Sequence, residues 1–343
     1  MKRFIVTGGS GFIGYHLAEY LSRQSENEIT VIDNHTRGIA DDMFNRLIER
    51  QNVVFINEDM TKKEFYNKLS GYYDGIYHLA ALNGTKNFYD RPYEVMRINI
   101  LTLMNMLEWC NSQNCGAFLF SSSSETYAGT FNCFLSEHTE FVPTKEDIPL
   151  TVDDIFNPRW SYGGSKITGE LLVSNYCHTN NISFKIIRYH NVYGIRMGYD
   201  HVLPEFFKRI YNKVDPFPIF GGEETRAFCA VEDAVKATES VMLSARCNGE
   251  IIHIGNSNQE IKIIDLLKMV LNIADFHPVI DIKSAPQGCV MRRCPNTDKL
   301  FNLTGFKAKI KLEEALPKML KWYVDIYQKL EKDDKGNVIN NGK

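Results

Sequence analysis

Long hydrophobic runs, paired cysteines and an excess of charge of one sign are all missing from this sequence. No apolar run approaches the roughly 18 residues that a membrane-spanning helix needs, so we expect no membrane partner. The formal net charge is only −3, which gives no global field to attract nucleic acid or an anionic membrane. None of the eight cysteines forms a CxxC pair, and no histidine lies at zinc-finger spacing. We therefore expect no metal site and no nucleic-acid partner.

The chain is long enough to bury a large core. Its 343 residues suit one large domain or two closely joined ones, and its contents of 44% hydrophobic and 24% charged residues are ordinary for globular proteins. The first expected strand begins within four residues of the N-terminus, which leaves no room for a signal peptide. We therefore expect a cytoplasmic protein with reduced cysteines.

The most informative motif is a glycine pattern at residues 7–14, between a short apolar run and a helix-like stretch. Glycines at Gly8, Gly11 and Gly14 let a strand turn tightly, bring backbone N–H groups close to a pyrophosphate and start a helix whose N-terminus favours an anion. A second apolar run ends at Asp33, nineteen residues after Gly14. A dinucleotide-binding fold places the carboxylate that binds the adenosine ribose at this spacing.

Short β-branched or aromatic runs alternate with helical patterns through about residue 191. The expected strands are 3–7, 29–33, 53–57, 75–80, 117–122 and 183–190. The expected helices between them are 12–23, 61–69, 93–113 and 161–178. Repeated βα units predict an α/β fold, a Rossmann-type doubly wound parallel sheet.

The rhythm changes after residue 191, where short strands mix with helical stretches near 203–213, 232–246, 262–273 and 312–330. This pattern predicts a smaller C-terminal α/β cap that binds substrate at the carboxyl ends of the strands. The expected division is an NAD-binding domain at 1–191 with returning segments near 225–256, a cap mainly at 192–331, and a disordered tail at 332–343. Residues 129–158 form a long polar stretch that is either functional or mobile, and its role stays open.

Tyr162 and Lys166 stand four residues apart, on one face of an expected helix. Alone, such a pair is most often a surface pair; after a glycine-rich strand–helix loop, the catalytic interpretation is favoured. A free tyrosine has a pKa near ~10, and a nearby ammonium, helped by the positive nicotinamide, would favour the phenolate. Tyr162 could then take a proton from a sugar hydroxyl while hydride leaves the same carbon.

Four consecutive serines, 121–124, end the fifth expected strand. Their hydroxyls lie where a substrate hydroxyl or carbonyl could be held by hydrogen bonds. The alternative is a serine-rich turn that satisfies its own backbone.

Together these motifs resemble the extended short-chain dehydrogenase/reductases that act on nucleotide sugars, a family of epimerases, dehydratases and decarboxylases. The resemblance rests on 7–14 and, in chain order, on 31–34, 58–60, 78–81, Asn99, 121–127, 162–166, 188–194, 225–228 and 293–295. It implies NAD as the cofactor, a nucleotide-diphosphate sugar as the substrate, and a homodimer through the helices at 93–113 and 161–178. Asp33, with no basic residue directly after it, favours NAD over NADP, although Arg37 lies close.

The resemblance also implies roles for individual residues. Implied to bind NAD are Gly8, Gly11, Phe12, Ile13, Gly14, Asp33, Asn34, Asp59, Met60, Leu79, Ala80, Ala81, Asn99, Ser121, Tyr162, Lys166 and Tyr189. Implied to bind the substrate are Asn83, Ser123, Ser124, Asn191, Val202, Arg226 and Arg293. Implied to be catalytic are Ser123, Glu125, Tyr162 and Lys166.

The expected reaction begins with oxidation of the hexose at C4 to a 4-keto intermediate. The intermediate is then epimerised or dehydrated with internal return of the hydride. Glu125 could remove the acidified C5 proton in a dehydratase, or it could be a solvent-facing or capping glutamate. Alternatives are a decarboxylase of a UDP-glucuronate type of substrate, for which Glu125 and Arg293 are suggestive, and an NAD-binding redox-sensing module without catalysis.

Overall fold

The computed structural model describes residues 1–135, 141–285 and 290–336. The predicted Rossmann-type fold is confirmed, because a seven-stranded parallel sheet has the order β11-β6-β5-β4-β1-β2-β3. The bounds are β1 Lys2–Thr7, β2 Asn27–Asp33, β3 Val53–Asn57, β4 Gly75–His78, β5 Ala117–Ser123, β6 Ser183–Tyr189 and β11 Ile251–Ile254. The strand order reverses between β1 and β4, and sheets of this kind bind ligands at such a reversal.

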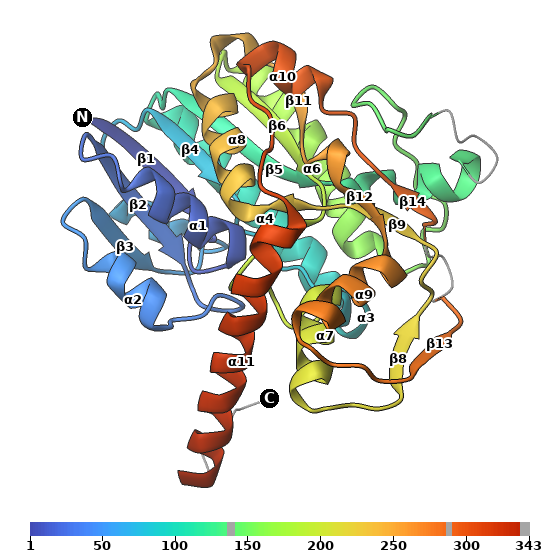
Figure 1. Ribbon diagram of the computed structural model, residues 1–343. Helices are drawn as coiled ribbons and strands as arrows, with labels where there is room; N and C mark the ends of the chain where they lie inside the picture. The colour runs from blue at the N-terminus through green and yellow to red at the C-terminus, as the bar shows by residue number, and fades with distance from the viewer. Residues whose placement is uncertain (136–140, 286–289, 337–343) are drawn as a thin grey trace.

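Helices cover both faces of the sheet, because its central strands are apolar on both sides. The main ones are α1 Phe12–Leu21, α4 Pro92–Ser112, α6 Trp160–Thr179 and α8 Val231–Leu243. In β1, Phe4 and Val6 pack into the core cluster that includes residues of α1 and α8, whereas Ile5 packs into the cluster with α4 and α6. Figure 1 shows α1 and α8 on the near side of the sheet, with the paired α4 and α6 behind it.

The cap has its own core, to which α7, α9 and α11 contribute buried leucines and aromatic residues. Its helices are α7 Val202–Tyr211, α9 Ile263–Ile273 and α11 Leu312–Gly336. Its strands are β8 Phe217–Phe220, β9 Thr225–Ala227, β12 Glu260–Lys262, β13 Ile280–Lys283 and β14 Arg292–Arg293. Strand β9 lies between β12 and β14, and a further short pair joins β7 Val192–Tyr193 to β10 Cys229–Ala230.

The other helices in the described residues are short. They are α2 Asp42–Ile48, α3 Thr85–Asp90, α5 Ala128–Thr130, α10 Asp298–Thr304, η1 Lys63–Lys68, η2 Ser124–Tyr127, η3 Phe131–Leu135, η5 Ala245–Cys247 and η6 Ser257–Gln259. The predicted helix at 61–69 is a short 3-10 helix, and α2, α3 and α10 were not predicted. Helix α2 had a local signal, since Asp41 caps it by accepting a hydrogen bond from the Phe44 N–H.

Three boundaries differ from the prediction for physical reasons. Strand β4 ends at His78 instead of residue 80, because the next two N–H groups turn to the Thr7 hydroxyl at 3.1 and 3.0 Å. Helix α10, assigned to the cap by the sequence division, packs on α8 and β11 of the Rossmann part. Helix α11 runs to Gly336, so the first five residues of the predicted disordered tail are helical; the rest of that tail and 136–140 of the long loop lie outside the described residues.

Candidate active site

The glycine loop forms the floor of a cleft of about 410 Å³ at the reversal of the sheet. Gly8 adopts φ +70°, a left-handed conformation that favours glycine. A Cβ on Gly14 would lie 2.1 Å from the Gly8 carbonyl oxygen, so only glycine lets the first turn of α1 approach the loop this closely. The loop and the N-terminus of α1 therefore offer the cradle of backbone N–H groups that a dinucleotide pyrophosphate fits.

Nearly all residues implied to bind NAD line this cleft. They are Gly8, Gly11, Phe12, Ile13, Gly14, Asp33, Asn34, Asp59, Met60, Leu79, Ala80, Ala81, Ser121, Tyr162, Lys166 and Tyr189. Asn99 does not line it. Its amide accepts from the Leu82 N–H at 2.7 Å and donates to the Leu82 carbonyl at 3.2 Å and to the Ser165 hydroxyl at 3.0 Å. Asn99 thus holds a loop beside the cleft, and its contact with NAD stays a prediction.

Asp33 ends β2 at the cleft, oriented by two backbone N–H groups. Its carboxylate accepts from Ser10 N at 3.0 Å and from His35 N at 2.7 Å. The Arg37 guanidinium lies elsewhere, against Gly84 and Gly198, and Asp200 and Tyr162 are the charged and titratable groups that act on it. Arg37 therefore reaches toward the Tyr162 end of the cleft, away from the position expected of a residue that reads a 2′-phosphate.

We expect Arg37→Ala to leave the preference for NAD over NADP unchanged. Asp33→Ala should weaken NAD binding by about tenfold or more, because it deletes a charge-assisted hydrogen bond to the ribose. Calorimetric titration of nucleotide-free protein with NAD and with NADP measures both effects. Tighter binding of NADP by the wild type, abolished in Arg37→Ala, would contradict this prediction.

Tyr162 lies in α6 with its hydroxyl hydrogen-bonded to Ser123 and Asn83, at the end of the cleft. Its ring stacks on Phe88, with 5.0 Å between centroids and 14° between planes. The Lys166 ammonium donates to the Ser121 carbonyl at 2.7 Å and lies 5.6 Å from the centre of the Tyr162 ring. Tyr162, Ser123 and Lys166, which were predicted to be catalytic, therefore lie close together at the carboxyl end of β5.

Burial dominates the electrostatics of this pair in the protein without NAD. The expected phenolate depends on the positive nicotinamide as well as on Lys166; in the protein alone, burial raises the pKa of Tyr162 to about 12. The hydrogen bonds from Ser123 and Asn83 and the charge of Arg37 oppose that rise, and Glu125 adds to it. Burial also lowers the pKa of Lys166 to about 7, against the attraction of Glu170. In the protein alone, Tyr162 is therefore a protonated phenol.

Glu125 is neither solvent-facing nor free to act alone, because two arginines hold its carboxylate. Arg159, just before α6, donates to Oε2 from Nε at 3.0 Å and from Nη2 at 2.6 Å. Arg293 of β14 donates to Oε1 from Nη1 at 2.5 Å. Burial opposes ionisation of Glu125, yet the charges and hydrogen bonds of Arg293 and Arg159 outweigh it and lower its pKa to about 2. We call these three residues the Glu125 cluster.

The residues implied to bind substrate fall into two groups. Asn83 and Ser123 line the cleft; Ser124, Asn191, Val202, Arg226 and Arg293 do not. Arg226 of β9 and Arg293 of β14 are register partners in the small cap sheet, so the structure brings them side by side. Asn191 donates to the Ala227 carbonyl at 3.3 Å, Ser124 is buried, and Val202 begins α7.

The sequence reasoning missed two arginines. Arg159 completes the Glu125 cluster. Arg196 lines the cleft, forms an ion pair with Asp41, and donates to the carbonyls of Ser10 at 2.9 Å and Ile39 at 3.1 Å. Arg196 thereby ties the glycine loop to the segment after β2. Its contacts join segments 155 and more residues apart, so no local pattern marked it.

Comparison with known proteins agrees with this geometry. The model of the NAD dependent epimerase/dehydratase family matches residues 4–255. The chain belongs to that family. It is an enzyme of that class, and NAD is its cofactor, as the sequence predicted. A redox-sensing module without catalysis therefore gains no support.

Relatives across the whole chain include several activities. The UDP-N-acetyl-alpha-D-glucosaminuronate decarboxylase of Bacillus cytotoxicus is 29% identical over 95% of this chain and 98% of that protein. The UDP-glucose 4-epimerase of Thermotoga maritima, solved with UDP-glucose, has a TM-score of 0.80 and 24% identity, and covers 95% of this chain and 99% of that one. The dTDP-glucose 4,6-dehydratase DesIV of Streptomyces venezuelae, solved with NAD and TYD, has a TM-score of 0.82 and 20% identity, covering 94% and 97%. The two solved structures share the fold of this chain.

Two further findings concern the described residues. No helix in residues 1–135, 141–285 or 290–336 has both the length and the apolar character needed to cross a membrane. Within the same ranges, no group of three or more His, Cys, Asp or Glu side chains could hold a metal ion.

Proposed function

We propose that this protein removes the C6 carboxyl group of a UDP-linked uronic acid after oxidation of the sugar at C4. The Glu125 cluster is the observation that carries the proposal. The relative named UDP-N-acetyl-alpha-D-glucosaminuronate decarboxylase supports a uronate as the substrate class. Epimerisation and dehydration, which we expected first from the sequence, begin with the same oxidation and differ afterwards.

The residues at the end of the cleft support the first step. NAD, when bound, supplies a hydride acceptor for C4 and can return the hydride at the end of the reaction. Ser123 would hold the C4 hydroxyl by a hydrogen bond. With NAD bound, the positive nicotinamide and the Lys166 ammonium near the Tyr162 ring would favour the phenolate of Tyr162, which would then take the C4 hydroxyl proton.

The Glu125 cluster separates the possible second steps. Elimination or 5-epimerisation needs a base that removes the C5 proton, and a doubly paired carboxylate with a pKa of about 2 is a weak base. Decarboxylation needs no such base. Once C4 is a ketone, the C6 carboxylate is in the β position, so the C5–C6 bond can break, carbon dioxide leaves, and the electron pair is delocalised onto the C4 oxygen. C5 then takes up a proton.

The charge of the cluster fits the same substrate. Arg293 and Arg159 bring two guanidinium groups to the cluster, and a guanidinium favours a carboxylate over an uncharged hydroxymethyl group. The Nε of Arg293 is buried with no hydrogen-bond partner in the part of the chain that is described, so one donor of the cluster is unsatisfied there. We infer that Arg293 orients the uronate carboxylate while Glu125 and Arg159 hold the guanidinium in place.

The experiment is incubation of the purified protein with UDP-glucuronate, UDP-N-acetylglucosaminuronate and UDP-glucose. NMR identifies the sugar products, and label placed at C6 reports carbon dioxide. We expect release of the C6 label from a uronate and no change of UDP-glucose. Formation of the C4 epimer with the carboxyl group retained would refute the proposal and favour a 4-epimerase, which needs only Ser123 and Tyr162.

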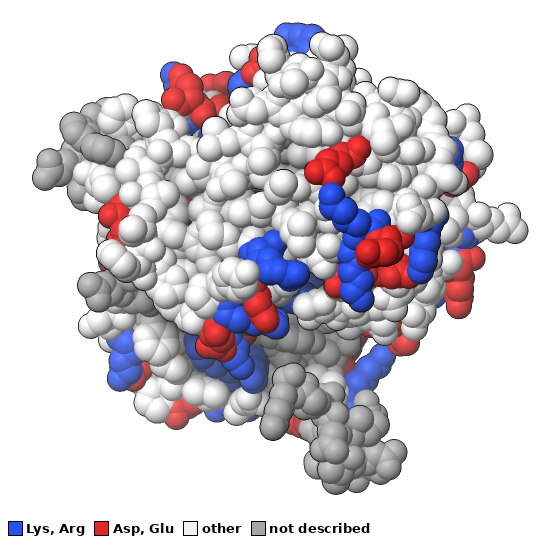
Figure 2. Space-filling model, turned by 180° about the vertical axis from the view of Figure 1, so that it is seen from behind, with Lys and Arg blue, Asp and Glu red and all other residues white. Residues whose placement is uncertain are grey.

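We also propose that the protein is a homodimer through α4 and α6. Their outer side carries exposed apolar side chains, with Tyr93 76% and Leu171 60% exposed. Figure 2 shows the side of the molecule opposite to that of Figure 1, where a broad area has no charged side chain. Packing on the sheet does not cover Tyr93 and Leu171, because these side chains are largely exposed. Sedimentation equilibrium of the pure protein measures its mass.

A further inference from the structure

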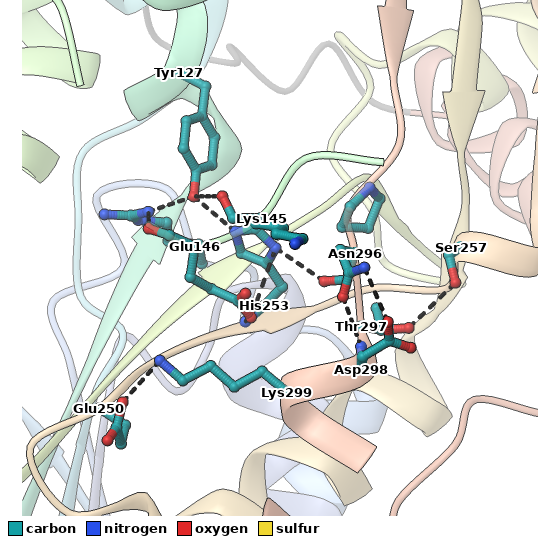
Figure 3. A network of polar contacts seen from close by, with 12 residues as sticks. Tyr127, Lys145, Glu146, Glu250, His253, Ser257, Asn296, Thr297, Asp298 and Lys299 are labelled. Atoms are coloured by element: carbon teal, nitrogen blue, oxygen red, sulfur yellow. Dashed lines mark hydrogen bonds and ion pairs between the residues drawn. The ribbon is translucent and has the colours of Figure 1, made fainter. Parts of the chain in front are cut away.

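A buried chain of polar side chains runs behind the candidate site and is used by none of the steps above. Arg188 of β6 donates to both carboxylate oxygens of Glu170, at 2.8 and 2.6 Å, and to the Tyr127 hydroxyl. The Tyr127 hydroxyl lies 2.7 Å from Nε2 of His253. Nδ1 of His253 lies 3.1 Å from the Asn296 carbonyl oxygen. Figure 3 shows His253 between Tyr127 on one side and Asn296 on the other.

The donors and acceptors of these groups determine which way each hydrogen bond in this chain points. The Asn296 carbonyl can only accept, so Nδ1 of His253 carries the proton and Nε2 accepts from the Tyr127 O–H. The Tyr127 oxygen in turn accepts from Arg188, which can only donate. Every bond from Arg188 to Asn296 therefore points the same way. Burial of the imidazole lowers the pKa of His253 to about 3, which agrees with the neutral ring that this pattern requires.

Three members of this chain stand close in sequence to residues of the candidate site. Tyr127 stands two positions after Glu125, and Asn296 stands three positions after Arg293. Glu170 follows Lys166 by one turn of α6, and it also accepts from Ser122, the neighbour of Ser123, at 2.5 Å. The chain thus connects the backbone segments that carry the site, which come from different parts of the sequence.

The long loop whose role the sequence left open is also joined to this chain. Arg188 donates to the backbone carbonyl of Glu146 at 3.0 Å. The Glu146 carboxylate accepts from the backbone N–H of His253 at 3.0 Å. Thr144 of the same segment donates to the Cys294 carbonyl at 2.8 Å, and its own carbonyl accepts from Asn296 N at 2.6 Å. Residues 144–146 therefore lie between the hydrogen-bonded side chains Arg188, Tyr127 and His253 and the segment that follows Arg293.

We propose that the Arg188–Tyr127–His253 chain is a positioning device that fixes the segment of Glu125 against the segment of Arg293. The inference deepens the proposed function, because it rests on the use of Glu125 and Arg293 in the reaction. Tyr127 and His253 have no exposed surface and Arg188 only 2%, so water cannot replace a lost partner without rearrangement. A Glu125–Arg293 contact built between two separate segments needs such a fixed reference to stay within hydrogen-bond distance.

Tyr127→Phe tests the proposal, because it keeps the ring and deletes only the hydroxyl. The matched control is Tyr327→Phe, which deletes a buried hydroxyl that donates to the Pro204 carbonyl at 3.3 Å in the cap. We expect kcat with UDP-glucuronate to fall about tenfold or more in Tyr127→Phe, with KM and bound NAD within about twofold of the wild type. The control should keep its kcat, even where both variants melt at a lower temperature.

A second pair of variants keeps the test decisive if Tyr127→Phe does not fold. His253→Gln retains an amide that can accept and donate, whereas His253→Leu retains neither group. We expect the glutamine variant to keep clearly more of the wild-type kcat than the leucine variant. Equal kcat in the wild type, Tyr127→Phe and both His253 variants would overturn the positioning role.

Crystal structures of the same variants separate this proposal from the proposed function. The device predicts that Arg293 Nη1 no longer reaches Glu125 Oε1 in Tyr127→Phe, whatever reaction the enzyme performs. If that contact is lost while release of the C6 label continues at the wild-type rate, the use of the Glu125 cluster in the reaction is refuted. If the contact is kept in all variants, the positioning device is refuted instead.

Discussion

Replacing Tyr162 by phenylalanine is expected to lower kcat by about a thousandfold or more while the protein still folds and retains NAD. A positioned acid or base contributes roughly 10²–10⁴ to the rate of a proton transfer. Ser123 and Asn83 contact the Tyr162 hydroxyl at the end of the cleft. The nearby His78 is buried, with its ring stacked on Phe118 and Phe120, and is therefore no alternative base. The phenylalanine ring can keep the stacking on Phe88.

The measurement is turnover of UDP-glucuronate together with the NAD content of the purified protein after acid extraction. The matched control is Tyr323→Phe, which also loses a buried hydroxyl, one that donates to the Met197 carbonyl at 2.5 Å. Retention of more than about a tenth of the wild-type kcat by Tyr162→Phe would remove Tyr162 from proton transfer. Loss of bound NAD from Tyr162→Phe would instead mean that the hydroxyl serves mainly to bind the cofactor.

The fold could be predicted from the sequence because its signals are local. Runs such as 4–6 are apolar on both faces, which only a sheet covered on both sides accommodates. The glycine pattern could be interpreted for a similar reason, since the clash that a Cβ on Gly14 would cause involves Gly8, six positions away. The cleft-lining residues follow once the carboxyl ends of the strands are known.

The arrangement of the Glu125 cluster could not be predicted in this way. Arg293 reaches Glu125 across 168 positions of sequence, and Arg159 across 34. A glutamate two positions after a serine is compatible with a base, a solvent-facing residue or a helix cap, and the sequence left these interpretations open. The choice among them depends on β14 pairing with β9 and on the turn before α6, which are tertiary features.

The pKa values of Tyr162 and Lys166 in the protein alone could not be predicted for a similar reason. Spacing of four residues correctly brings Lys166 to the same face of α6. The spacing does not reveal how deeply both side chains are buried, and burial is the largest cause of both pKa shifts. A prediction of charge state therefore needs the packing around a motif as well as its spacing.

Replacing Glu125 by glutamine is expected to destabilise the protein by about 3 kcal/mol at pH 7. The lowering of the Glu125 pKa from 4.5 to about 2 corresponds to a stabilisation of this order. The side chain of Glu125 is only 23% exposed and that of Arg293 only 9%, so solvent screens the ion pair little. Glutamine keeps the shape but removes the negative charge that Arg159 and Arg293 both bind.

The pH dependence of this difference has a definite sign. The folded protein holds Glu125 ionised to a lower pH than the unfolded chain does, so the stabilisation is fully present above pH 4.5 and is lost as the pH falls toward 2. Urea unfolding midpoints of wild type and Glu125→Gln should therefore differ by a constant amount from pH 7 to about pH 5 and converge below it. The control Glu223→Gln removes an exposed carboxylate that pairs with the exposed Lys262, and it should change stability by less than about 0.5 kcal/mol.

The same variant tests the chemistry. If Glu125 holds Arg293 for a uronate carboxylate, then Glu125→Gln should still oxidise the sugar at C4 but release carbon dioxide more slowly, so that the 4-keto sugar accumulates. If Glu125 were the base for the C5 proton, the wild type would exchange C5 hydrogen for deuterium in heavy water while the carboxyl group stays in place. A carboxylate clamped by two arginines keeps its charge but loses basicity and mobility, and that loss suits an anchor for Arg293 better than a proton acceptor.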